Sequence, residues 1–125
     1  MTGATQTFRL PFPPSLHALY VHRPQGGRAK SRAYARWLKE AGWTLIEQRV
    51  QPHKLPVRLA LTFTPPDRRR RDLGDNYHKP VLDLLVAHRI LPDDSSRHVL
   101  GVDSHWTDGP AAGVEVAITS QMTFA

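Results

Sequence analysis

The sequence predicts a single α+β domain in which a mixed β-sheet of about four strands packs against two main helices, in the order β-α-β-α-β-β. Three observations support this fold class. The 125 residues are enough for one domain and few for two. Short stretches of alternating apolar and polar residues predict strands, and two longer stretches with apolar residues three or four positions apart predict helices. This order of elements favours helices packed on a small sheet, and we assign residues 1–125 to one domain.

The first half of the chain predicts a strand, a long loop and a helix. Residues 5–10 alternate as a short strand, which ends at Pro11 because proline cannot donate to a β-ladder. Residues 15–30 lack periodicity and indicate a long basic loop. Ser31 is suited to cap a helix over residues 32–49. The apolar face of this helix is Tyr34, Trp37, Leu38, Ala41 and Leu45.

Two features of this first helix lead to further expectations. Gly42 weakens the helix by about 1 kcal/mol relative to alanine, a cost that packing of Trp37 and Trp43 could offset. Tyr20 and both tryptophans are able to stack on bases, but the tryptophans fall in the apolar helix pattern, and we expect them in the core.

The second half predicts a strand, a second helix and a hairpin. Residues 57–63 alternate as a strand that stops at the prolines that follow. The second helix must begin near residues 75–78, because Pro80 is tolerated only in a first turn. Its apolar residues are Val81, Leu82, Leu84, Leu85 and Val86. Residues 97–106 and 113–119 predict two strands, joined as a hairpin across the turn residues 108–110.

Composition limits the possible functions. Seventeen Lys and Arg against eleven Asp and Glu give a net charge of +6, which favours an anionic partner. There is no cysteine, so a bound metal must use oxygen or imidazole ligands. The seven histidines show no HxxxH or HExxH spacing, and a structural zinc site is not predicted. We expect no export, no membrane span, no nucleotide cofactor and a cytoplasmic location.

Arginines stand next to aspartates in the segment 67–75, and this pairing indicates metal-dependent chemistry on a polyanion. Arginine attracts phosphate, whereas clustered aspartates repel it unless a divalent cation lies between them. Asp72 and Asp75 precede the second helix and Asp94 follows it. They could form a carboxylate cage for Mg²⁺, or Mn²⁺, if the chain turns back or another subunit supplies Asp94. The alternative is that these aspartates are ordinary cap and turn residues.

The basic residues also have two interpretations. Lys79 lies four residues after Asp75 and four before Asp83, so it could form a helical i,i+4 salt bridge. Alternatively, it could lie beside the metal and contact the scissile phosphate or position water. The four consecutive arginines cannot all share one face, so some should face a phosphate backbone, although a run of charge is often only solvated. The candidate DNA-binding residues are Arg23, Arg28, Lys30, Arg68, Arg69, Arg70 and Arg71.

Several of these motifs together resemble the RusA family of Holliday junction resolvases. The motifs are Leu10-Pro11-Phe12-Pro13-Pro14-Ser15, Lys30-Ser31 with Tyr34 and Trp37, Asp67 to Asp72, Asp75-Asn76 with Lys79, Leu82-Asp83 and Asp93-Asp94. The resemblance spans nearly the whole chain. It implies a homodimer of small mixed α/β subunits that binds four-way DNA junctions and makes paired, symmetric nicks with Mg²⁺. It also implies that Asp72, Asp75 and Asp94 bind metal and that Lys79 is the catalytic lysine.

Two departures from the family pattern affect this assignment. The family typically reads Asp-x-Asp-Asn, whereas Gly74 adds a residue between Asp72 and Asp75. In an extended segment one extra residue reverses the side-chain direction. A glycine-mediated bulge could restore convergence, and otherwise Asp93 or Asp67 could substitute for Asp72. The second departure is Leu16-His17, where the family often has asparagine.

The hypothesis is therefore a Mg²⁺-dependent endonuclease that resolves Holliday junctions during recombination and repair, encoded by a chromosome or a phage. A junction-binding protein that lacks cleavage is the first alternative, because the extra residue could spoil the acid cage. A general nucleic-acid-binding protein without junction preference is the second.

Overall fold

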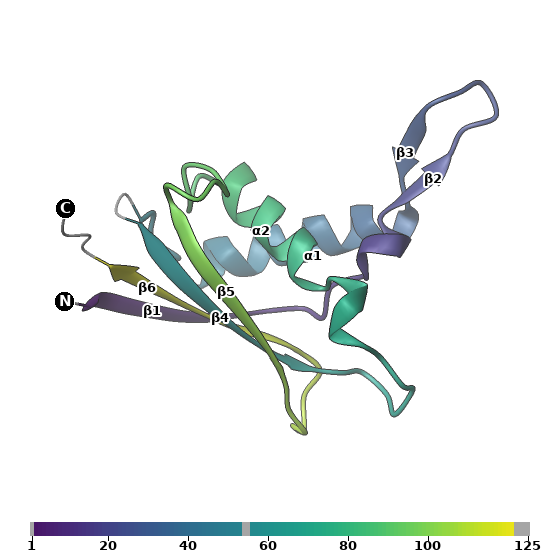
Figure 1. The fold of residues 1–125 in the computed structure, drawn as a ribbon. Helices are drawn as coiled ribbons and strands as arrows, with labels where there is room; N and C mark the ends of the chain where they lie inside the picture. Colours follow the sequence, from purple (N-terminus) through teal and green to yellow (C-terminus); the bar gives the residue numbers. More distant parts are fainter. Residues whose placement is uncertain (1, 54–55, 122–125) are drawn as a thin grey trace.

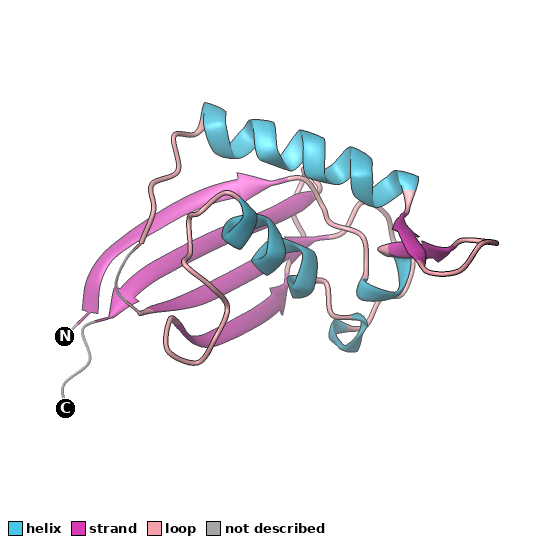
Figure 2. Cartoon of the chain, turned by 90° about the horizontal axis from the view of Figure 1, so that it is seen from above, coloured by secondary structure: helices cyan, strands magenta, loops and turns pink. Residues whose placement is uncertain are grey.

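A four-stranded mixed sheet with two helices on one face forms the body of the protein (Figures 1 and 2). The computed structural model describes residues 2–53 and 56–121. The strand order is β1-β6-β4-β5. The strands are β1 (Thr2–Leu10), β4 (Val57–Thr64), β5 (Val99–Trp106) and β6 (Gly113–Gln121), and the helices are α1 (Arg32–Glu47) and α2 (His78–Ala87). The predicted α+β class is confirmed. None of the described helices is both long and apolar enough to cross a membrane.

The predicted hairpin between the last two strands is wrong. β5 pairs in parallel with β4, whereas β6 pairs antiparallel with β4 on its other side and with β1. The reason is the central position of β4, whose residues Val57, Leu59, Leu61 and Phe63 are almost completely buried. Such a strand forms ladder hydrogen bonds along both edges, so β5 and β6 lie on opposite sides of it. The crossover that a parallel pair requires is supplied by α2.

A second correction concerns the segment that was predicted to be a loop. It contains the 3₁₀ turn η1 (Leu16–Ala18) and a small antiparallel hairpin of β2 (Tyr20–His22) and β3 (Arg28–Lys30). This β2–β3 hairpin projects from the body near the start of α1 (Figure 1). Gly26 and Gly27 form its tip with φ angles of 98° and 75°. Strands of three residues are too short to show a reliable alternation in the sequence.

Helix α1 begins as predicted, but only one of its tryptophans is buried. The Ser31 side chain accepts a hydrogen bond from the Tyr34 amide at 3.1 Å. Trp37 is buried and donates its indole N–H to the Pro11 carbonyl at 2.8 Å. Trp43 is 58% exposed, so its predicted place in the core is wrong. The helix ends at Glu47, before the left-handed backbone of Arg49, rather than at residue 49.

Gly42 lies where α1 approaches the end of α2. A methyl group added at Gly42 would be 3.1 Å from Nε2 of His88, which caps α2. The glycine therefore permits close helix contact, a reason that differs from the expected compensation by two tryptophans. Helix α2 begins at His78, as predicted, with Pro80 in its first turn.

Replacing Gly113 by alanine is expected to destabilise the sheet. Gly113 has a φ of 149°, and an added Cβ would lie 2.8 Å from the Leu10 carbonyl oxygen on the paired strand. The backbone strain and the clash should lower the free energy of unfolding by about 1–3 kcal/mol, measurable by urea denaturation. Gly74→Ala is the matched control, because a Cβ there meets no atom within 4 Å. Equal losses in both variants would contradict this explanation.

Candidate active site and nucleic-acid interface

Lys79 lies between two aspartates at the first turn of α2. Its Nζ is 3.0 Å from Oδ1 of Asp83 and 3.8 Å from Oδ2 of Asp94. The hydrogen bond to Asp83 raises the pKa of Lys79, and the charges of Asp83, Asp94 and Tyr20 raise it further. The ammonium group is therefore charged at neutral pH. Of the two aspartates four residues from Lys79 in the chain, Asp83 forms the helical salt bridge that was one interpretation of this lysine.

Asp94 reaches Lys79 because the chain turns back after α2. The backbone at Ile90 donates to the Leu85 carbonyl at 2.8 Å, and Leu91 is buried, so the segment that follows the helix is held against it. The sequence posed this as a geometric requirement: Asp94 had to return along the helix or come from another subunit. Within one chain, it returns as far as Lys79.

The turn before α2 brings together the two acids that Gly74 separates. Asp72 and Asp75 lie at the two ends of the 3₁₀ turn η2 (Leu73–Asp75), and the Asp72 amide donates to Oδ2 of Asp75 at 3.4 Å. Residues three apart lie on the same side of a 3₁₀ turn. The extra residue is thus accommodated by a tight turn, and the expected extended segment with a glycine bulge is not formed. Asn76 then adopts a left-handed conformation, with φ 55°, and separates η2 from α2.

Carboxylate oxygens of this kind are suitable ligands for Mg²⁺, but they do not form a ready-made cage. Over residues 2–53 and 56–121 the structure holds no group of three or more histidine, aspartate or glutamate side chains placed to bind a metal. It joins Asp72 to Asp75, and Asp94 to Lys79, in two separate contacts. Asp72 and Asp94 are exposed, so their carboxylates are accessible to a cation.

The two acids considered as substitutes already have other partners. Asp67 accepts hydrogen bonds from the Arg71 guanidinium and from the Arg69 amide, and these bonds lower its pKa to about 2. Asp93 accepts from the Ser95 amide at 2.9 Å and lies 2.8 Å from Nδ1 of His98. The hydrogen bonds from Ser95 and His98 lower the pKa of Asp93 to about 2. Both acids stabilise loops in this structure.

The arginine loop, residues 65–72, contains one arginine that pairs within the loop and three that are exposed to solvent. The Arg71 side chain is only 7% exposed, pairs with both carboxylate oxygens of Asp67 at 2.8 and 3.2 Å, and has its Cζ 5.5 Å from the centre of the Phe12 ring. Arg68, Arg69 and Arg70 are exposed. The expectation that the four arginines would not share one face agrees with this division. The involvement of each in DNA binding stays a prediction.

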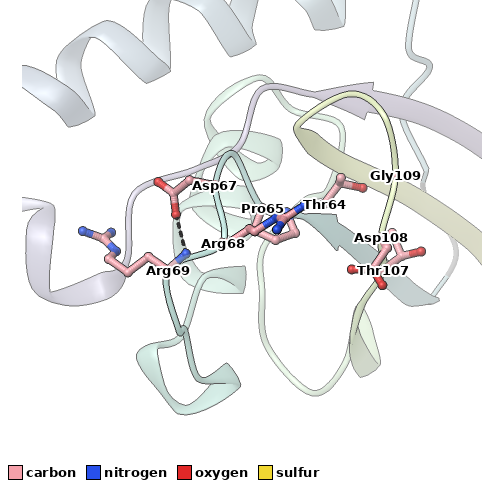
Figure 3. A pocket seen from close by; sticks show the side chains of 8 residues that line it. All are labelled: Thr64, Pro65, Asp67, Arg68, Arg69, Thr107, Asp108 and Gly109. Carbon is pink, nitrogen blue, oxygen red and sulfur yellow. Dashed lines mark hydrogen bonds between the residues drawn. The ribbon is translucent and has the colours of Figure 1, made fainter.

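An open pocket of about 670 Å³ lies beside this loop. One side is formed by Thr64, Asp67 and Arg68, and the other by the turn residues 107–109 that follow β5. Figure 3 shows the Arg68 and Arg69 side chains leaving the loop in different directions. The pocket is lined by both cationic and anionic side chains, so its lining does not by itself indicate an anion-binding site.

An aromatic contact that the sequence did not reveal joins the β2–β3 hairpin to helix α1. The Tyr20 and Tyr34 ring centres are 5.9 Å apart, edge to face. Burial raises the pKa of Tyr34 to about 12, and the charges of Asp83 and Tyr20 add to this. Tyr34 was assigned only to the apolar face of its helix. Its spacing gave no indication of a neighbour 14 residues away in the chain.

The fold and these side chains define a small basic nucleic-acid-binding protein with an acidic centre around a charged lysine. The sequence model of the family described as "Endodeoxyribonuclease RusA" matches residues 11–119. The chain belongs to the RusA family, and it is an endodeoxyribonuclease of the kind that resolves Holliday junctions. This confirms the family that the sequence motifs indicated. No curated protein matches the chain.

Proposed function

We propose that the protein is a homodimeric, Mg²⁺-dependent endonuclease that resolves four-way DNA junctions by paired, symmetric nicks in recombination and repair. The observation that carries this proposal is the contact of Lys79 with Asp83 and Asp94 at the start of α2, directly after the acidic turn of Asp72 and Asp75. The match to the family over residues 11–119 supports the junction as the substrate.

In this proposal Asp72, Asp75 and Asp94 are the metal ligands. When bound, Mg²⁺ supplies activation of water and stabilisation of negative charge at the phosphorus centre, and Mn²⁺ could substitute. The structure supports the chemical type of the ligands, since all three offer carboxylate oxygens. The short turn η2 holds two of them three residues apart on one side.

Lys79 is the proposed catalytic lysine. Its ammonium group would contact a non-bridging oxygen of the scissile phosphate and stabilise the charge that develops there. Asp83 holds the ammonium in place at 3.0 Å, while the Lys79 side chain stays 42% exposed and accessible to DNA. The salt bridge and the catalytic role are therefore compatible in one side chain.

A two-fold symmetric dimer would explain paired nicks, because it presents two equivalent sites to a substrate with matching symmetry. We propose that Arg68, Arg69 and Arg70, together with Arg23, Arg28 and Lys30, bind the phosphate backbone. Arg71 belongs to the same proposed set, although its contact with Asp67 indicates that it also holds the arginine loop. A cytoplasmic location, with a chromosomal or phage gene, fits this function.

Removing the exposed arginines is expected to weaken junction binding and flatten its salt dependence. Each phosphate that the protein no longer neutralises should reduce the slope of log K against log[salt] by about 1, so the slope of the triple variant R68Q/R69Q/R70Q should fall by about 2–3. Fluorescence anisotropy over a salt series measures this slope. Lys39→Gln removes an exposed charge from α1 and serves as a control. An unchanged slope in the triple variant would show that this loop does not bind phosphate.

The proposed function is tested with an end-labelled four-way junction and a linear duplex of the same sequence, with and without Mg²⁺. Symmetric nicks in the junction alone, dependent on the metal, are expected. Tight binding without nicking in Mg²⁺ or Mn²⁺ would overturn the proposal in favour of a junction-binding protein. Equal binding to junction and duplex would favour a general nucleic-acid-binding protein.

A further inference from the structure

The β2–β3 hairpin holds an arginine over the face of a tyrosine ring. Arg28 Cζ lies 4.0 Å from the centre of the Tyr20 ring, and the two residues belong to its paired strands. A guanidinium that stacks on a ring is restricted in motion but keeps its in-plane N–H donors for another partner. Within the part of the chain that the structure describes, no carboxylate forms an ion pair with Arg28. Arg28 is thus held in place with its donors available to an anion.

The Tyr20 ring connects this arginine to helix α1. One neighbour of Tyr20 is Arg28, and another is the buried Tyr34 in the first turn of α1. Helix α1 packs against α2, whose first turn carries Lys79. The base of the hairpin is therefore held on the helix that packs against the element carrying the side chain proposed to contact the scissile phosphate.

The surface beside this pair is open and suited to a DNA strand. A hollow of about 190 Å³ is lined by Tyr20, His22 and Arg28, together with part of the turn η1. The hairpin that carries this hollow projects from the body near the start of α1 (Figure 1). Arginine binds phosphate through two parallel N–H donors, and prior fixation of the guanidinium reduces the entropy lost on binding.

We propose that Arg28, held by Tyr20, is a positioning residue that binds one phosphodiester next to the scissile one on the cleaved strand. This inference rests on the proposed function, and it adds a defined role for the hairpin. By fixing a neighbouring phosphate, Arg28 would set how far the strand extends across Lys79. Correct placement of the reacting phosphate accelerates cleavage without any direct part in the chemistry.

The test replaces the phosphates that flank the nick, one at a time, with neutral methylphosphonates in a four-way junction. Single-turnover nicking is measured at saturating enzyme for the wild-type protein and for Arg28→Gln. At one flanking position, the methylphosphonate should reduce the nicking rate of the wild-type protein about tenfold. The same methylphosphonate should not further reduce the nicking rate of Arg28→Gln, because the effects of two groups in contact are coupled. Tyr20→Leu should lose this coupling, whereas Tyr20→Phe, which keeps the ring, should retain it.

Arg23→Gln at the hairpin tip is the matched control, because it removes the same charge without the tyrosine contact. It should weaken binding but keep the coupling between Arg28 and that phosphate. The inference is wrong if the rate losses from Arg28→Gln and from each methylphosphonate multiply at every position. Arg28 would then contribute only general electrostatic attraction to DNA. If the wild-type protein does not nick the unmodified junction at all, the proposed function fails first, so the two failures are distinguishable.

Discussion

Asp75→Asn is expected to slow junction nicking by about two to three orders of magnitude while leaving junction binding nearly intact. The loss follows from removing a carboxylate from the proposed metal site, where the cation contributes several kcal/mol to the transition state and each 1.36 kcal/mol is about tenfold in rate. Binding should persist because the exposed arginines are unchanged. Single-turnover nicking in Mg²⁺, compared with anisotropy in Ca²⁺ or EDTA, separates the two quantities.

Because the extra residue Gly74 lies between Asp72 and Asp75, Asp72→Asn is the informative variant to compare with Asp75→Asn. Asp72 and Asp75 flank the turn η2 and exchange two hydrogen bonds: the Asp72 amide donates to Oδ2 of Asp75, and the Asp75 amide donates to the Asp72 carbonyl. Asp72→Asn should match the rate loss of Asp75→Asn if the tight turn compensates for Gly74. Full activity in Asp72→Asn would show that Gly74 has moved this carboxylate out of the site. Full activity in both variants would exclude the turn from metal binding.

The sequence predicted the elements with strong periodicity and failed where pairing or exposure depends on distant residues. Helix α1 and strand β4 were predicted close to their true bounds, because Ser31 and the alternation over residues 57–63 are local signals. The pairing partner of β5 was not predictable, because the sequences of β5 and β6 would each allow pairing with either edge of the buried strand β4. Trp43 was misplaced because it was grouped with the apolar face by residue type. With about 3.6 residues per turn, a position two residues from both Ala41 and Leu45 lies on the opposite side of the helix from them.

The candidate site shows the same division between local and distant information. The salt bridge of Lys79 with Asp83 is one of the two i,i+4 pairs that the spacing allowed, and the structure forms this one. The approach of Asp94 to Lys79 depends on how the chain returns after α2, and residue spacing does not encode that path. The stacking of Arg28 on Tyr20 requires a hairpin that the sequence presented as a loop. The local consequence of Gly74 was also misjudged, because an extended segment was assumed in place of a 3₁₀ turn.

Lys79→Gln is expected to reduce the nicking rate by about 100-fold or more, since it removes a positive group from the developing charge on the phosphate. Protein stability should change little. The salt bridge with Asp83 is partly exposed, and an exposed i,i+4 pair contributes only about 0.3–0.5 kcal/mol. The rate is measured under single-turnover conditions, and stability by urea denaturation of the same preparation.

Asp83→Asn distinguishes a catalytic lysine from one that serves only the salt bridge. This variant also breaks the pair, but it keeps the ammonium group, which still has Asp94 as a neighbour. If Lys79 acts on the phosphate, Asp83→Asn should lose about tenfold at most, because the charge remains and only its placement is relaxed. If the salt bridge is the whole role of Lys79, the two variants should lose the same small amount. Lys79→Arg adds a further distinction: it keeps the charge but changes its shape, so partial recovery of the rate would assign the effect to charge at this position.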